Sequence, residues 1–205
     1  MLRFLDQVNA IVGMLLFLAY LYQVFYTLYG LAFCRRDRRK AARQTPAKPS
    51  RRYAALICAR NEESVISELI SSLRAQDYPA ELLDIYVLAD NSTDATARVA
   101  RQSGAITFER FNHYQVGKGY ALNELFSRIR SSRPLSDYDA FLVFDADNIV
   151  DSHFVSAMDR TFAQGYDVLT SYRNSKNFAS SWVSAGYSIW FLREARFLNY
   201  PRMKL

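Results

Sequence analysis

The chain has 205 residues, half of them hydrophobic, which is enough for one domain with a real core. Its formal net charge of +6 is unevenly distributed, because residues 35–52 contribute nine basic side chains against Asp37 alone. The remainder of the chain is slightly acidic, at about −2, which removes the main compositional support for nucleic-acid binding.

The N-terminal segment contains a long, mainly apolar stretch. No charged residue lies between Gln7 and Cys34, and this stretch exceeds the roughly 20 apolar residues that a helix needs to cross a bilayer. The arginine-rich segment that follows it predicts, by the positive-inside rule, that the next domain is cytoplasmic. A cleaved signal peptide is the alternative, but its apolar region would be shorter and would precede small residues rather than an arginine cluster.

These features predict a division of the chain into three parts. We expect a transmembrane anchor over residues 1–34, a basic juxtamembrane linker over residues 35–52 and a folded domain over residues 53–205. The protein is then expected to be a single-pass protein of the plasma membrane with its domain in the cytoplasm.

From Tyr53 onward, strand-like and helix-like segments alternate. Short apolar runs predict strands at residues 53–59, 82–90, 105–110, 140–147 and 167–172. Helices are predicted at residues 62–73, 92–102, 118–130 and 152–164, with Asn61 capping the first and Ser92 or Thr93 near the cap of the second. This alternation predicts an α/β fold with a mainly parallel sheet and helices on both faces.

Four polar clusters fall where such sheets bind ligands, outside the carboxyl ends of the strands. They are Arg60, Asn61 and Glu62; Asp90, Asn91 and Ser92; Lys118; and Asp145 with Asp147. Taken singly, most have an ordinary explanation as helix caps or Asx-turns, and the GKG around Lys118 lacks the spacing of a phosphate-binding P-loop. Convergence at one edge would make them a single site.

The acidic pair gives the clearest chemical indication. In an extended strand Asp145 and Asp147 point to the same side, and the mutual repulsion of two carboxylates favours a bound cation. Mg²⁺ and Mn²⁺ suit such oxygen ligands and commonly complete their coordination with water and phosphate oxygens. The pair therefore predicts a divalent cation bound together with a diphosphate.

The order of the clusters resembles the family 2 glycosyltransferases, membrane-associated enzymes of the GT-A (Rossmann-like) fold that use nucleotide-sugar donors. The matching segments are ARNEE (59–63), LADNSTDAT (88–96), GKGYALN (117–123) and FDAD (144–147). The later segment SYRNSKNFASSWVSAGYSIWF (171–191) is also similar to membrane-bound members of that family. The resemblance covers essentially the whole chain from Tyr53.

The resemblance implies a role for each cluster. The donor-binding residues would be Arg60, Asn61, Glu62, Asp90, Ser92, Lys118 and Asp145. Asp90 would read the base, Lys118 would lie near the base or the diphosphate, and Asp147 would hold the divalent cation, with Asp145 near the ribose or the metal. The implied donor is a UDP-sugar, and the implied acceptor is lipid-linked or a polysaccharide.

One expected part of the chemistry has no match. Direct displacement by an acceptor hydroxyl, which inverts the anomeric centre, needs a general base. The family supplies it from a downstream acidic motif, often TED, followed by a QxxRW-like segment, and this chain contains neither. We expect the chain to be the donor-binding half of a GT-A domain that is incomplete at its C-terminus, with the base beyond Leu205.

Two other functions remain as hypotheses. The first is a non-catalytic, membrane-bound nucleotide-sugar-binding fragment or pseudoenzyme. The second is a membrane-tethered nucleotidyltransferase, which would need a triphosphate-binding element that the sequence after residue 59 does not provide. Trp182 and Trp190 could stack on an acceptor sugar, although packing in a core or at the membrane interface is the simpler interpretation. His113 and His153 show no ligand-like spacing.

Overall fold

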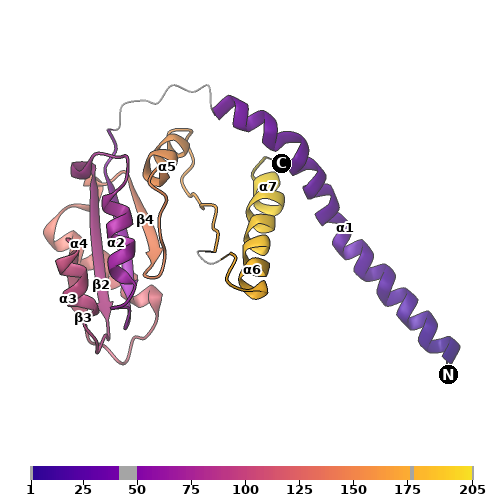
Figure 1. Ribbon diagram of the computed structural model, residues 1–205, viewed down its shortest axis with the longest axis horizontal. Coiled ribbons are helices and arrows are strands. Elements are labelled where there is room, and N and C mark those ends of the chain that lie inside the picture. The colour runs from indigo at the N-terminus through magenta and orange to yellow at the C-terminus, as the bar shows by residue number, and fades with distance from the viewer. Residues whose placement is uncertain (1, 42–49, 176–177, 205) are drawn as a thin grey trace. The chain divides into compact units, whose positions relative to one another are not determined.

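The computed structural model describes residues 2–41, 50–175 and 178–204. Two compact units make up the chain. One contains residues 46–169, and the other contains residues 1–45 together with residues 170–205. Figure 1 shows the first as strands flanked by helices and the second as helices.

A four-stranded parallel sheet forms the centre of the unit at residues 46–169. Its strands are β1 (Tyr53–Ala59), β2 (Leu83–Asp90), β3 (Ile106–Arg110) and β4 (Ala140–Asp145), in the order β3-β2-β1-β4. All three pairings are parallel, as the alternation of strands and helices predicted. The order reverses between β1 and β4, and this is where open α/β sheets bind ligands.

Helices cover both faces of this sheet. On one face, α2 (Ile66–Arg74), α3 (Thr96–Gln102) and α5 (Phe154–Phe162) contribute to a core that includes Ile57 and Val87. On the other, α4 (Lys118–Ser132) packs its buried residues against Leu56 and Leu88. The predicted α/β class, with helices on both faces, is confirmed. Short η1 (Ala80–Leu82) and η2 (Leu135–Asp137) precede β2 and β4.

A buried carboxylate fastens the start of β1 to α5. Asp159 accepts hydrogen bonds from the hydroxyl of Tyr53 at 2.7 Å, from Arg51 at 3.1 Å and from the hydroxyl of Tyr78 at 3.4 Å. Burial and the neighbouring carboxylate raise the pKa of Tyr53, and they raise the pKa of Tyr78 to about 12. The cluster lies at the amino end of the sheet, opposite the edge where ligands are expected.

The other unit is helical. It contains α1 (Leu2–Ala41), α6 (Trp182–Arg193), the π-helix η3 (Glu194–Asn199) and α7 (Tyr200–Lys204). Within it, Arg193 donates a hydrogen bond to Gln23, and the guanidinium of Arg202 lies 5.7 Å from the ring centre of Tyr26. In α1, the segment Arg3–Ala32 contains an 18-residue stretch with a mean hydropathy of 1.9 and is long and apolar enough to cross a membrane.

Several predicted elements differ from the observed ones. Residues 167–172 form no strand: the chain is irregular there, and Val168 is 85% exposed. The β-forming residues of this segment have no neighbouring strand among residues 50–175 that could satisfy their backbone groups, so propensity alone was misleading. The first helix begins at Ile66 rather than at Glu62, after a turn in which the Glu62 carbonyl accepts from the amides of Val65 and Ile66.

Candidate functional site

The carboxyl ends of the strands bring the predicted residues to one face of the sheet. Asp145, the last residue of β4, is the register partner of Cys58 in β1, and Cys58 is the partner of Leu88 in β2. Asp90 lies two residues beyond Leu88 and so points to the same face. Lys118 begins α4, the helix that covers this face. The structure thus joins three of the four polar clusters on the α4 side of the sheet.

The most buried charges at this edge belong to a pair that sequence reasoning missed. Arg110 ends β3 and is the register partner of Asp90. Its Nη1 atom donates to Asp90 Oδ1 at 2.6 Å, and the two side chains are 7% and 11% exposed. The signal was present in the sequence, because the last residues of two adjacent predicted strands carry opposite charges.

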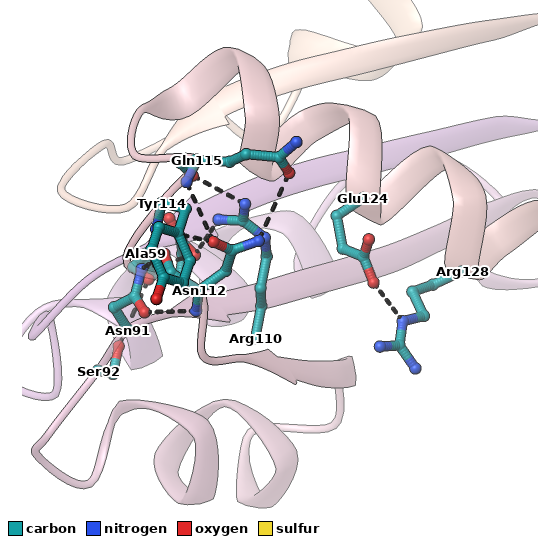
Figure 2. A network of polar contacts seen from close by, with 10 residues as sticks. Ala59, Asn91, Ser92, Arg110, Asn112, Tyr114, Gln115, Glu124 and Arg128 are labelled. Atoms are coloured by element: carbon teal, nitrogen blue, oxygen red, sulfur yellow. Dashed lines mark hydrogen bonds and ion pairs between the residues drawn. The ribbon is translucent and has the colours of Figure 1, made fainter.

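Arg110 also fixes the loop that leads into α4 (Figure 2). Its Nη2 atom donates to the carbonyl of Gln115 at 2.8 Å, and Asn112 Oδ1 accepts from the Gln115 amide at 3.0 Å. Asn91, in the left-handed region with a φ of 53°, donates from its side chain to Asp90 Oδ1 at 3.2 Å and to the Asn112 carbonyl at 3.0 Å. Arg110 therefore connects Asp90 to the segment that carries Lys118.

Lys118 pairs with Asp145 across the start of α4. The two side chains are 45% and 59% exposed, so water screens the pair and it can exchange partners. The helix is entered through Gly117, which has a φ of 129°. A groove of about 520 Å³ lies beside Lys118, lined by Val116, Gly117, Gly119, Tyr120 and Asn123.

The loops after β1 and β2 bind each other, which corrects the predicted helix caps. Asn61 has a φ of 57° and caps no helix; its Oδ1 atom accepts from the Thr93 amide at 2.8 Å. Ser92 Oγ accepts from the Asn61 amide at 3.2 Å instead of capping α3. The amide at the start of α3 donates instead to Asp94 Oδ1, at 3.0 Å. Asn61 and Ser92 therefore hold together the two loops that border the carboxyl ends of β1 and β2.

The remaining members of the first cluster lie on the same rim. Arg60 is exposed and Glu62 is half-buried. Within the part of the chain that the structure describes, neither side chain has an ion pair. The Glu62 amide donates to Thr96 Oγ1 at 2.8 Å, which ties this loop to α3. Both side chains are free to meet a ligand at the edge.

The acidic pair does not lie in an extended strand, which corrects the geometry assumed for it. β4 ends at Asp145, and the Asn148 amide donates to the Asp145 carbonyl at 3.1 Å, so residues 145–148 form a turn. Asn148 also donates to Asp147 Oδ1 at 3.2 Å and accepts from the Asp145 amide at 3.2 Å. Asp147 is exposed in this turn and Ala146 is buried. The strand prediction was two residues too long.

These carboxylates suit a cation of one kind only. Across residues 2–41, 50–175 and 178–204, no group of three or more His, Cys, Asp or Glu could hold a metal ion. Mg²⁺ bound with a nucleotide takes one or two protein carboxylates and completes its shell with water and phosphate oxygens. Asp145 and Asp147 supply at most two carboxylates, so any divalent cation there would need further oxygen ligands, such as water and the phosphates of a nucleotide.

Cys58 lies at the same edge of the sheet, and its thiol has low reactivity. Its side chain is half-buried beside the α4 core, and burial raises the pKa of the thiol to about 11. The thiol is thus protonated at neutral pH and is a poor nucleophile. Its contribution to this part of the sheet is packing against the α4 core.

Comparison with known proteins decides the family. Residues 49–203 match the family described as glycosyltransferase like family 2. This chain belongs to that family. The predicted resemblance is confirmed, and with the parallel sheet it confirms the predicted GT-A class of fold.

The curated relatives of this family 2 glycosyltransferase are longer proteins. Beta-monoglucosyldiacylglycerol synthase of Nostoc sp. is 31% identical over 151 residues, which cover 68% of this chain and 31% of the relative. 4,4'-Diaponeurosporenoate glycosyltransferase of Staphylococcus haemolyticus is 27% identical over 147 residues, covering 70% and 35%. The chain spans about a third of the length of these relatives.

Solved structures show partial similarity. Residues 1–349 of TarS from S. aureus align with a TM-score of 0.45 at 17% identity, over 64% of this chain and 43% of that one. The mannosyltransferase PcManGT from Pyrobaculum calidifontis, solved in complex with GDP-Man and Mn²⁺, aligns with a TM-score of 0.41 at 22% identity, over 60% and 36%.

Proposed function

We propose that this chain forms the donor-binding part of an inverting, metal-dependent glycosyltransferase. It transfers a sugar from a nucleotide-diphosphate sugar, a UDP-sugar, to a lipid-linked or polysaccharide acceptor at the cytoplasmic face of the plasma membrane. The observation that carries the proposal is the convergence of Asp90, Lys118 and Asp145 on one face at the carboxyl ends of neighbouring strands.

The base and the diphosphate of a nucleotide-diphosphate sugar each have a complementary group at this edge. Asp90 offers an acceptor for the N–H of a base, and the Arg60 to Glu62 turn borders the same position. Lys118 supplies a positive charge that can turn from Asp145 to a phosphate oxygen, because the ion pair is exposed. Asp147, with Asp145, would hold the divalent cation.

The chemistry requires the stabilisation of a leaving group. Departure of a nucleoside diphosphate builds negative charge on the phosphate oxygens, and the ammonium group of Lys118 would offset that charge. A bound divalent cation would neutralise part of the same charge. Direct attack by an acceptor hydroxyl, activated by a base, requires no covalent intermediate on this chain's residues.

The membrane and the acceptor enter the proposal through separate observations. Residues 3–32 of α1 are apolar and long enough to span a bilayer, and the basic residues 35–52 favour placing the next unit in the cytoplasm. The Nostoc relative is named as the synthase of a glucosylated diacylglycerol, which is a lipid. This name supports a lipid acceptor for the proposed reaction.

The test is a binding measurement followed by a turnover measurement. The full chain in detergent is titrated with UDP, with and without Mn²⁺, and is then incubated with UDP-sugars while released UDP is measured. We expect UDP to bind, Mn²⁺ to strengthen binding, and any release of UDP to require Mn²⁺. Binding without release would favour the non-catalytic nucleotide-sugar-binding protein, and failure to bind any nucleoside diphosphate would refute the proposal.

A further inference from the structure

We propose that Arg110 determines which nucleobase the site accepts, by leaving Asp90 only one oxygen with which to bind the base. The inference rests on the proposed nucleotide-sugar function and deepens it. Arg110 acts here as a positioning residue, because its effect on the ligand passes through the Asp90 carboxylate.

One oxygen of Asp90 is already committed. Asp90 Oδ1 accepts from Arg110 Nη1 at 2.6 Å and from Asn91 Nδ2 at 3.2 Å. Both donors are themselves held in place, since Arg110 Nη2 donates to the Gln115 carbonyl at 2.8 Å and Asn91 Oδ1 accepts from the Asn112 amide at 2.8 Å (Figure 2). Breaking this arrangement would leave a buried charge unpaired, so Oδ1 stays engaged.

The other oxygen is open. Within residues 2–41, 50–175 and 178–204, Asp90 Oδ2 has no hydrogen-bond partner, whereas each fully buried side-chain nitrogen or oxygen there has one. Oδ2 must therefore contact solvent, and it does so at the carboxyl end of β2, where the site lies. The Asp90 carboxylate presents one free acceptor atom rather than two.

A single acceptor discriminates between bases by their donors. Uracil has one ring N–H, between two carbonyl groups, so one oxygen satisfies it. Guanine presents a ring N–H beside an amino group, a pair of donors that suits both oxygens of a carboxylate. With Oδ1 occupied, the amino group of guanine would lose its water without gaining a partner, which disfavours binding. The site should prefer a uridine nucleotide to a guanosine nucleotide.

The first test uses the unmodified chain. UDP, GDP and IDP are compared by competition binding to the full chain in detergent. IDP is the control for ring size, because hypoxanthine is guanine without its amino group. We expect UDP to bind most tightly and IDP to bind about tenfold more tightly than GDP. GDP binding as tightly as IDP, or more tightly, would overturn the inference.

The second test changes Arg110 and needs a matched control. Arg110→Met removes the charged and shorter of the two hydrogen bonds to Asp90 Oδ1 and leaves only the 3.2 Å bond from Asn91, so the ratio of the GDP to the UDP dissociation constant should fall roughly tenfold. Arg101→Met is the control, since Arg101 of α3 pairs through exposed side chains with Glu109 of β3, the strand that carries Arg110. The ratio is unaffected by an inactive fraction of protein, so partial unfolding cannot mimic the result.

The outcomes separate this inference from the function on which it rests. An unchanged ratio in a folded Arg110→Met variant, with UDP still bound by the unmodified chain, overturns only the role of Arg110. Absence of binding to UDP, GDP and IDP alike in the unmodified chain overturns the proposed function and the inference with it. A reduced ratio in Arg110→Met but not in Arg101→Met supports both.

Discussion

Arg110 and Lys118 each pair with a carboxylate at the same edge of the sheet, but the burial of the two pairs differs. The Asp90–Arg110 pair is almost wholly buried, and removing either partner would leave an uncompensated charge. The Lys118–Asp145 pair is about half exposed, so its groups exchange partners easily. At the scale of residues, the first pair fixes geometry and the second is available to a charged ligand.

A substitution of Asp147 tests whether this residue binds the divalent cation. Asp147→Ala removes an exposed carboxylate from the turn after β4, and we expect the Mn²⁺-dependent gain in UDP affinity to fall by about tenfold, or ~1.4 kcal/mol. Asp137→Asn, an exposed carboxylate before β4, is the control for the change in net charge. Calorimetric titration measures both, and equal Mn²⁺ effects in the two variants would remove Asp147 from the metal site.

The buried tyrosines predict a loss of stability at high pH. Burial raises the pKa of Tyr78 from 10.0 to about 12, so above pH 10 the folded chain retains a proton that the unfolded chain loses. The contribution of Tyr78 to stability is complete below pH 10 and is lost as the pH rises through about 12. The free energy of unfolding should fall by up to about 1.4 kcal/mol per pH unit for this group.

Denaturant titrations at pH 9 to 11 check this slope. Tyr53 and Tyr138 also have raised pKa values, caused mainly by burial, so they contribute with the same sign. Tyr78→Phe removes one of the three groups and should make the decline shallower. Identical slopes for this variant and the unmodified chain would show that Tyr78 does not titrate in this way.

At the scale of elements, the sequence predicted helices and strands best where a single local pattern determines the element. The apolar runs at residues 53–59 and 83–90 form the two central strands, which are buried on both faces, and the glycine-flanked start of α4 lies at Lys118 as expected. The strand predicted at residues 167–172 does not form, because its residues favour strands but no strand in the described part of the chain pairs with them.

The candidate site was predicted in part for a related reason. Asp90, Lys118 and Asp145 follow predicted strands or begin a helix, so their convergence could be expected from the topology. The opposite charges of Asp90 and Arg110 are visible in the sequence, but only the register of β3 on β2 shows that the two residues are partners. Asn favours both helix caps and left-handed backbone, so the sequence alone does not separate the two roles at Asn61. Local patterns located the edge, and tertiary pairing decided what each side chain does there.

The entry into α4 gives a prediction about backbone strain. Gly117 has a φ of 129° and a ψ of 156°, a region that residues with a Cβ rarely adopt. Gly117→Ala should lower the free energy of unfolding by about 1–3 kcal/mol, although an added Cβ meets no atom within 4 Å. Gly119→Ala, inside the helix and equally unhindered, should be neutral or stabilising. Denaturant unfolding of both variants measures the difference, and equal stabilities would contradict the strain.

At the scale of the whole molecule, the apolar α1 and the basic residues after it predict an orientation. The sequence has only Cys34 and Cys58, so a background with serine at both allows single cysteines to be placed. A cysteine at Leu2 should react with a membrane-impermeant thiol reagent in intact cells, and one at Asp137 should react only after permeabilisation. The reverse pattern would place the sheet unit outside the cytoplasm.

The most direct measurement of the central claim is an experimental structure of the full chain with UDP and Mn²⁺. We expect the base to lie against the free oxygen of Asp90, the diphosphate to lie within reach of Lys118, and the anomalous signal of manganese to lie beside Asp147. Density for the nucleotide at any other place on the sheet unit, with these three side chains free of ligand, would contradict it.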